Sequence, residues 1–193
     1  MAPVEQRWNK EGEDISARGM PTEEYIHLYR RWGEGDIGVI VAGNMMLKYD
    51  AVEAYGNPIL VDDHDGRVEA FRKVSKVAKA HGSLFIAQLS HPGRQGNAAL
   101  NPYPVSASDV HLTIAWAGNS FAKPRALTIP EIKDMVKTWG EVAYQCYQAG
   151  FDGVQIHCAH GYLLAQFLSL TTNKRTDEVS FAMECRMAHL TTF

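Results

Sequence analysis

Apolar residues recur along the chain with two alternating spacings. In three stretches they return every three or four positions, which predicts amphipathic helices: residues 22–32, 66–80 and 132–147. Short, nearly continuous apolar runs bounded by glycines separate these stretches: residues 37–42, 84–89 and 151–157. Such runs are typical of strands buried on both faces, as in a parallel sheet. A helix-forming run over 162–168 completes the series, and the alternation predicts an α/β protein built from βα repeats.

Local signals mark where these elements begin and end. Thr128 and Glu131 form a capping-box pattern that predicts the start of the third helix. Thr22 can begin the first helix, and Gly82 follows the second as a stop. The stretch 91–127 is rich in Pro, Gly, Asn and Ser, so we expect an irregular, functional loop on the ligand-binding side.

Composition narrows the function classes. The 193 residues are 46% hydrophobic and 21% charged, as in ordinary soluble globular proteins, and the net charge of -3 disfavours nucleic-acid partners and anionic membrane surfaces. The three cysteines show no Cys-x-x-Cys spacing, which favours a reduced compartment and a cytoplasmic location. Neither a signal peptide nor an apolar run of about 20 residues is evident, so no membrane association is expected.

Polar side chains gather where the last predicted strand ends. His157 closes that strand, and His160 and Tyr162 follow within the next five residues. Ligands of parallel α/β proteins bind at the carboxyl ends of the strands. The sequence therefore predicts a functional site formed by two imidazoles and a phenol.

The same imidazoles leave a metal site as an alternative. His157, His160 and Cys158, with His91 or Asp152, would give a zinc-dependent hydrolase. Three residues along one strand exit do not complete a tetrahedral site, and no acidic fourth ligand stands at a recognisable spacing. We therefore predict no metal, and bound zinc in stoichiometric amount would reverse that view.

Three sequence blocks together point to a known family. Residues 87–95, 124–128 and 150–176 resemble the old yellow enzyme family of FMN-dependent NAD(P)H:flavin oxidoreductases, and residues 21–23 and 40–44 agree in order and spacing. The resemblance covers roughly residues 1–178. Residues 179–193 have no recognisable counterpart and are interpreted as a divergent tail.

The resemblance implies a TIM (β/α)8 barrel with FMN lying across the carboxyl ends of its strands. NADH or NADPH would reduce the flavin, which would reduce an activated C=C bond. The residues that match the family's flavin contacts are Ala2, Pro3, Val4, Glu5, Gly43, Asn44, Gln88 and His157. A glutamine amide both donates and accepts hydrogen bonds, which suits the polar edge of the flavin ring system.

The resemblance also assigns catalytic roles to the residues at the strand exit. His157 and His160 match a pair that donates hydrogen bonds to the carbonyl oxygen of an α,β-unsaturated substrate, a contribution of about 3 kcal/mol per donor. Tyr162 matches the proton donor to the α-carbon, and a reference pKa of about 10 keeps a phenol protonated at neutral pH. Arg94 and Arg175 could each contact a phosphate or a substrate carboxylate, but solvated surface positions are commoner for arginine, and we expect those.

The match departs from the family in length. A complete barrel has eight βα units in about 250 residues, whereas this chain matches about the first four, the N-terminal half. The family's phosphate cradle comes from later strands, so we expect the isolated chain to bind FMN weakly or not at all. Four strands leave open edges, which favour a homo-oligomer. The alternative function is a catalytically impaired member that acts as a non-enzymatic, associating fragment.

Overall fold

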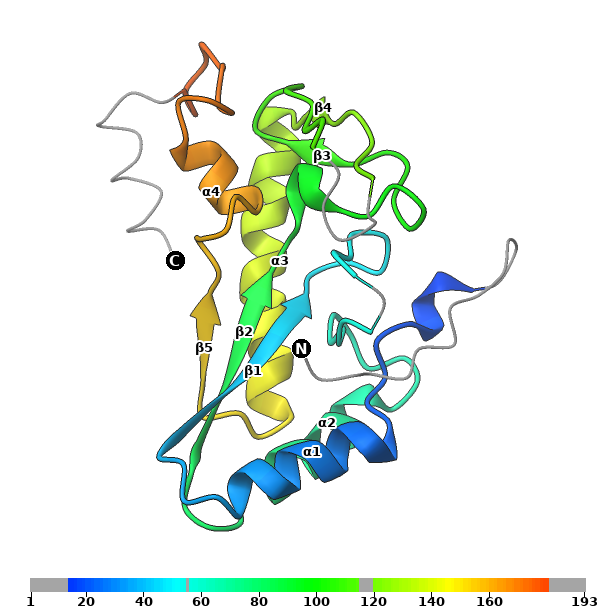
Figure 1. Ribbon diagram of the computed structural model, residues 1–193, viewed down its shortest axis with the longest axis vertical. Helices are drawn as coiled ribbons and strands as arrows, with labels where there is room; N and C mark the ends of the chain where they lie inside the picture. Colours follow the sequence, from blue (N-terminus) through cyan, green and yellow to red (C-terminus); the bar gives the residue numbers. More distant parts are fainter. Residues whose placement is uncertain (1–13, 55, 115–119, 181–193) are drawn as a thin grey trace. The chain divides into compact units, whose positions relative to one another are not determined.

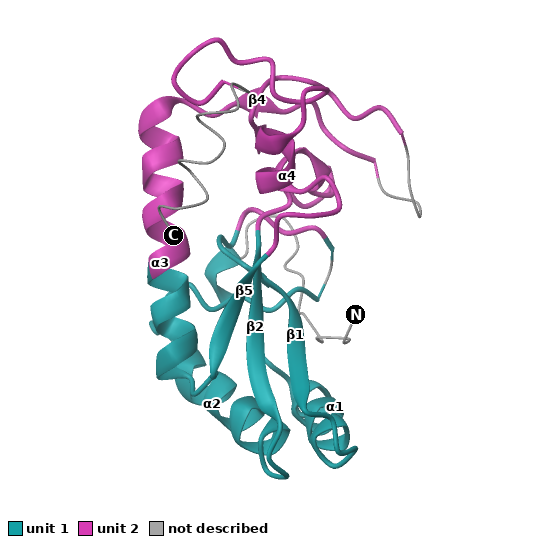
Figure 2. Ribbon diagram, turned by 90° about the vertical axis from the view of Figure 1, so that its left-hand side faces the viewer, with its two compact units in different colours: residues 1–49, 54–90, 141–156 teal, residues 50–53, 91–140, 157–193 magenta. Residues whose placement is uncertain are grey.

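The computed structural model describes residues 14–54, 56–114 and 120–180 (Figure 1). The chain divides into two compact units, coloured separately in Figure 2. Unit 1 comprises residues 1–49, 54–90 and 141–156, and unit 2 comprises residues 50–53, 91–140 and 157–193.

A three-stranded parallel sheet forms the centre of unit 1. Its strands are β1 (Val39–Met46), β2 (Leu84–Ser90) and β5 (Gly153–Ile156), in the order β1-β2-β5. Ala42 of β1 pairs with Ala87 of β2, and Ala87 pairs with Val154 of β5. The parallel pairing confirms the α/β prediction. Within the described residues the three strands form an open sheet, with β1 and β5 as its edges.

Two helices of unit 1 pack against each other, and the first of them also packs against one face of this sheet. Helix α1 (Glu23–Gly33) begins at Thr22, whose hydroxyl accepts a hydrogen bond from the Tyr25 backbone N–H. Helix α2 (Arg67–Ala78) approaches so closely that a Cβ on Gly33 would lie 2.7 Å from the Ala78 carbonyl oxygen. Ring packing joins α1 to the sheet, since the Tyr29 and Phe85 centroids are 5.1 Å apart.

The opposite face of the sheet is largely uncovered. Val39, Val41 and Leu84 are 52%, 40% and 51% exposed, although they are apolar. The amides of Gln88 and Gln155 bond to each other at 2.6 Å on the same face. The prediction that these strands are buried on both faces is therefore wrong, because burying the second face requires another layer and the described part of unit 1 supplies only one.

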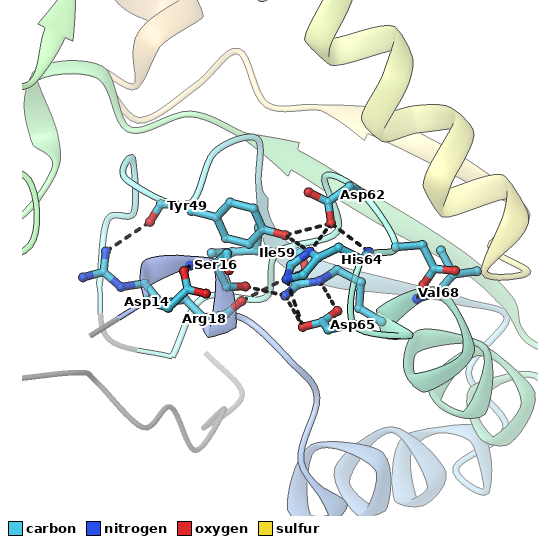
Figure 3. Close-up of polar contacts among 11 residues, drawn as sticks. Asp14, Ser16, Arg18, Tyr49, Ile59, Asp62, His64, Asp65 and Val68 are labelled. Atoms are coloured by element: carbon cyan, nitrogen blue, oxygen red, sulfur yellow. Dashed lines mark hydrogen bonds and ion pairs between the residues drawn. The ribbon is translucent and has the colours of Figure 1, made fainter. Parts of the chain in front are cut away.

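A fully buried arginine joins three segments of unit 1. The guanidinium of Arg67 forms a bidentate ion pair with Asp65 and donates to the backbone carbonyl oxygens of Ser16, Ile59 and Arg18. Figure 3 shows the surrounding polar groups, in which Tyr49, Asp62, His64 and Asp65 lie close together. These bonds connect η1 (Ile15–Ala17) and the segment before α2 to the start of that helix.

Unit 2 has little regular structure apart from its helices. The loop after β2 contains η2 (Gly93–Gln95), and a short parallel pair joins β3 (Val105–Ser106) to β4 (Arg125–Ala126). The stretch 91–127 is thus mostly irregular, as predicted, but includes a strand pair that the sequence pattern missed. Helix α4 (Leu163–Leu168) is the last helix in the described part of this unit.

Helix α3 (Ile129–Gln148) contributes residues to both units. Its start confirms the predicted capping box: Glu131 Oε2 accepts from the Thr128 N–H at 2.8 Å, and the Thr128 hydroxyl accepts from the Glu131 N–H at 3.4 Å. None of the helices in the described ranges is both long and apolar enough to span a membrane.

The predicted elements agree with the observed ones except at some ends. The helices expected at 22–32, 66–80 and 162–168 correspond to α1, α2 and α4 within one or two residues. The strand expected at 37–42 runs instead from Val39 to Met46, because it continues through Gly43 and Asn44 with a register shift between Ala42 and Met45. Glycine and asparagine are poor strand formers, so the strand extends to Met46 because of its pairing with β2 and not because of intrinsic strand propensity.

Candidate functional site

The loop after β5 brings three predicted site residues of unit 2 together. The ring centroids of His157 and His160 lie 5.1 Å apart, those of His157 and Tyr162 4.9 Å, and those of His160 and Tyr162 6.3 Å. Each pair is close to edge-on, with interplanar angles of 73°, 66° and 83°. The two imidazoles and the phenol therefore form one cluster.

The backbone of this loop adopts a conformation that few residues tolerate. His160 has φ 56° and Gly161 has φ 74°, both in the left-handed region. The His160 carbonyl oxygen accepts a hydrogen bond from Gln95 Nε2 at 2.9 Å, and the Leu163 N–H donates to the His91 carbonyl oxygen at 2.9 Å. Contacts from the segment 91–95 therefore hold the loop in this shape.

His157 is buried, with 6% of its surface exposed, and its surroundings fix its protonation state. Burial lowers its pKa, and the nearby His160 lowers it further, so the imidazole is neutral at pH 7. Its Nδ1 accepts a hydrogen bond from the Ala159 N–H at 3.2 Å. A neutral imidazole with an accepting Nδ1 carries its proton on Nε2. His157 therefore offers an N–H donor at Nε2.

The three side chains differ in their access to solvent. His157 is buried, Tyr162 is half-buried and His160 is exposed. An N–H donor beside a phenol can stabilise developing negative charge on an oxygen and supply a proton nearby. Chemically, the cluster suits the polarisation and protonation of a carbonyl compound.

Unit 1 carries the other described residues that were predicted to contact a cofactor. Gln88 lies on the uncovered face of the sheet, where its Nε2 donates to Gln155 Oε1. Gly43 and Asn44 lie near the carboxyl end of β1, and Asn44 adopts a φ of 31°. Ala2, Pro3, Val4 and Glu5 lie outside the described residues.

The alternative zinc ligands serve other purposes. Asp152 accepts hydrogen bonds from Lys79 Nζ at 2.5 Å and the Phe85 N–H at 2.8 Å. His91 Nδ1 accepts from the Gly93 N–H at 3.0 Å, and burial raises the pKa of the Cys158 thiol. In residues 14–54, 56–114 and 120–180, no group of three His, Cys, Asp or Glu side chains is arranged to hold a metal ion.

Sequence reasoning misjudged one arginine and missed one glutamine. The side chain of Arg175 is 8% exposed, and it donates to the carbonyl oxygens of Ala107 and Leu127, so the expected surface position is wrong. Gln166 is 1% exposed and bonds to four partners around the site loop. Its signal in the sequence is a polar residue three positions after the buried Leu163, on the apolar side of a short helix.

Comparison with protein families and curated proteins places the chain among flavin enzymes. The model of the NADH:flavin oxidoreductase / NADH oxidase family matches residues 13–192. An NADH-dependent flavin oxidoreductase, nadA, of Aspergillus parasiticus is 47% identical over 178 residues, which cover 91% of this chain and 40% of that protein.

Two further relatives agree with this match. The NADH-dependent flavin oxidoreductase iliE of Hypocrea jecorina is 34% identical, with 92% of this chain and 48% of that protein covered. Putative 12-oxophytodienoate reductase 5 of Oryza sativa subsp. japonica is 40% identical over 126 residues, which cover 63% of this chain and 34% of that protein. The chain spans less than half the length of these relatives. It belongs to the NADH:flavin oxidoreductase / NADH oxidase family of FMN-dependent TIM-barrel proteins, as the sequence motifs predicted.

Proposed function

We propose that this chain carries the substrate-activating residues of an FMN-dependent oxidoreductase of the ene-reductase type. The observation that carries the proposal is the cluster of His157, His160 and Tyr162, with ring centroids 4.9 to 6.3 Å apart. The substrate class is an α,β-unsaturated carbonyl compound. NADH is the reductant in this proposal. Parallel assays with NADPH test the expectation that either nicotinamide cofactor can reduce the flavin.

The residues of unit 1 suit a flavin. A Cβ built on Gly43 meets no heavy atom within 4 Å, so the backbone at the carboxyl end of β1 is accessible to a flat ring. The uncovered sheet face carries the amides of Gln88 and Gln155, which offer both donors and acceptors to the polar edge of such a ring. We therefore propose Gly43, Asn44 and Gln88 as flavin contacts of unit 1. For His157 of unit 2, the same role is proposed from the family resemblance alone. Bound FMN supplies the hydride.

The protein's own groups act on the substrate. The Nε2–H of His157 donates a hydrogen bond to the carbonyl oxygen, and His160 provides the second donor. This polarisation stabilises negative charge that develops on the oxygen as the β-carbon is reduced. Tyr162 transfers its phenolic proton to the α-carbon, which completes the saturated product. The buried position of His157 strengthens its hydrogen bond, since little water competes there.

Separate measurement of the two half-reactions tests this proposal. The protein is incubated with excess FMN and NADH without oxygen, and the flavin absorbance is followed after addition of 2-cyclohexen-1-one. We expect Tyr162→Phe to leave reduction by NADH unchanged and to slow reoxidation by the enone at least about 100-fold. His157→Ala should slow the same step about 100-fold to 1,000-fold. The matched control His81→Asn changes an exposed histidine in the turn after α2 and should leave both steps unchanged.

Reoxidation of Tyr162→Phe at the wild-type rate would refute the role of the phenol. The FMN concentration is kept high, because we expect this chain to bind FMN weakly. A flavin retained at one per chain through gel filtration would contradict that expectation. Two further points stay predictions. One is the assignment of residues 1–178 to the N-terminal half of an FMN-binding TIM-barrel domain and of 179–193 to a divergent tail. The other is the cytoplasmic location.

A second candidate function rests on the uncovered sheet face. Val39, Val41 and Leu84 are about half exposed, and β1 and β5 are edge strands of the described sheet. Apolar surface and open strand edges favour association with another chain. A colourless protein whose oligomers depend on concentration, and that gives no enone reduction, would favour this non-enzymatic function over the redox one.

A further inference from the structure

A buried glutamine on α4 uses its whole amide in hydrogen bonds. Gln166 Nε2 donates to the carbonyl oxygens of Pro92 at 3.1 Å and Gly161 at 2.7 Å. Its Oε1 accepts from the Arg94 N–H at 3.3 Å and from the Ser106 hydroxyl at 2.8 Å. A primary amide has two N–H donors and an oxygen with two lone pairs. Every hydrogen-bonding position of Gln166 is therefore occupied.

One of these partners lies inside the site loop. Gly161 connects His160 to Tyr162, so the bond from Gln166 fixes the peptide unit between the two side chains. The other side of the loop is held by Gln95, whose amide donates to the His160 carbonyl oxygen. A Cβ on Gly161 would lie 2.6 Å from Gln95 Nε2, so the loop and this amide fit closely. Two glutamines thus hold adjacent peptide units of the loop.

The segment 91–95 is shaped around the same glutamine. A Cβ on Gly93 would lie 2.2 Å from Gln166 Oε1, and Gly93 has φ 59°. Both the lack of space and the left-handed backbone conformation therefore require glycine at this position. The Gly93 N–H bonds to His91 Nδ1, and the His91 carbonyl oxygen accepts from Leu163. The segment and the site loop are therefore tied at both ends of the first turn of α4.

An apolar residue at position 166 would satisfy helix packing but not these bonds. Methionine has a similar length, yet it would leave the buried polar groups of Pro92, Gly161, Arg94 and Ser106 without this partner. Buried donors and acceptors that lose a partner are costly, so the loop would move to recover hydrogen bonds. The His160 backbone is held at positive φ, so on loss of these bonds it would relax toward the negative φ values that L-residues prefer.

We propose that Gln166 is a positioning residue that holds His160 and Tyr162 against His157 through Gly161. The four hydrogen bonds of its amide go to Pro92, Gly161, Arg94 and Ser106 and not to the three rings. It acts by fixing the backbone from which two of the rings project. The catalytic consequence rests on the proposed function. The positioning is a property of this chain and is tested without cofactor or substrate.

The first test measures ring proximity by NMR. Nuclear Overhauser effects between ring protons of His157 and His160, and of His157 and Tyr162, are recorded for wild type, Gln166→Met and Gln145→Met. Gln145 lies half-buried on α3, and its amide bonds to no other residue in the described part of the chain, so it is the matched control. We expect both effects to be lost in Gln166→Met and kept in Gln145→Met. Wild-type effects in folded Gln166→Met would overturn the proposal.

Gln166→Glu decides the matter if the methionine variant does not fold. Its protonated carboxyl can donate one hydrogen bond to Gly161 or Pro92, whereas the ionised form can donate none. The ring contacts should therefore be present at low pH and disappear as the carboxyl ionises. Contacts that persist after ionisation would overturn the proposal.

The second test measures catalysis in the flavin-loaded protein with 2-cyclohexen-1-one. Misplacement by about 1 Å lowers a rate about 100-fold, so kcat should fall by that factor in Gln166→Met while reduction of the flavin by NADH stays unchanged. Unchanged kcat with lost ring contacts would overturn the catalytic consequence. If wild type itself reduces no enone, the proposed function fails, and the NMR result still decides the positioning.

Discussion

Replacement of Arg67 by methionine should destabilise unit 1 strongly. The guanidinium is fully buried and uses all five N–H groups: two bond to Asp65 at 2.8 and 2.6 Å, and three bond to the carbonyl oxygens of Ser16, Ile59 and Arg18 at 2.7, 2.9 and 3.1 Å. Methionine keeps most of the apolar stem and removes every donor. The partners, which are partly buried, then lack their compensating charge or hydrogen.

The size of the effect follows from the burial of the ion pair. Removing one partner of a buried pair costs about 3–5 kcal/mol, because it leaves the other charge without compensation. Loss of the cation–π contact with Tyr49, whose ring centroid lies 4.9 Å from Cζ, acts in the same direction. A change of 1 kcal/mol shifts the melting temperature of a chain of this size by about 2–4 °C, so we expect a decrease of about 6–20 °C.

Thermal and urea unfolding followed by circular dichroism measure the change. Arg31→Met is the matched control, since that arginine pairs with Glu34 on the surface of α1 with 65% of its side chain exposed. The control should change the free energy of unfolding by less than about 1 kcal/mol. The double variant Arg67→Met with Asp65→Asn should recover part of the loss, because it removes the uncompensated charge. A loss below about 1 kcal/mol in Arg67→Met would refute the reasoning.

Three further predictions concern protonation, capping and association. His157 has a lowered pKa, so its neutral Nε2–H form should be observed at pH 7 by ¹⁵N NMR. Its contribution to the free energy of unfolding should be lost as the pH falls below 6.5, the ordinary pKa of histidine. A titration midpoint above 6.5 would contradict this prediction. Thr128→Ala should lower the free energy of unfolding, measured in urea, by about 1 kcal/mol. Arg125 and Thr128 lower the pKa of Glu131 to about 2, so the contribution of Glu131 to stability should be lost as the pH falls from 4.5 toward 2. Full stability in Thr128→Ala would contradict a capping role. Val41→Lys should weaken self-association in sedimentation experiments, whereas Ile114→Lys, at a 68% exposed position in unit 2, should not; equal effects would argue against the sheet face as the contact.

Local signals in the sequence were sufficient where the physical cause is local. Thr22 caps α1 and Thr128 caps α3 as predicted, because a hydroxyl reaches backbone N–H groups three residues away. The Val/Ile-rich runs predicted the strands, and parallel order followed from the helices between them. The sequence could also predict the grouping of His157, His160 and Tyr162, since all three lie within six consecutive residues.

Long-range contacts account for what the sequence pattern did not predict. Gln166 bonds to Ser106, 60 residues earlier, and Arg67 bonds to Ser16, 51 residues earlier. No spacing rule predicts such pairs, because the side-chain periodicities of helices and strands describe neighbours on one element. The exposed face of β1 was missed for a related reason: an apolar run predicts a strand, but the number of layers that cover it depends on other elements.

The sequence by itself determined the βα order, the helix starts, the family and the three side chains of the candidate site. Only the tertiary structure decided that His157 is a neutral donor at Nε2, that the backbone between His160 and Tyr162 is held by Gln166, and that one face of the sheet is open. Residue types and short spacings determine local conformation and the chemistry that the side chains can carry out. Protonation, orientation and burial depend on groups that meet only when distant segments pack together.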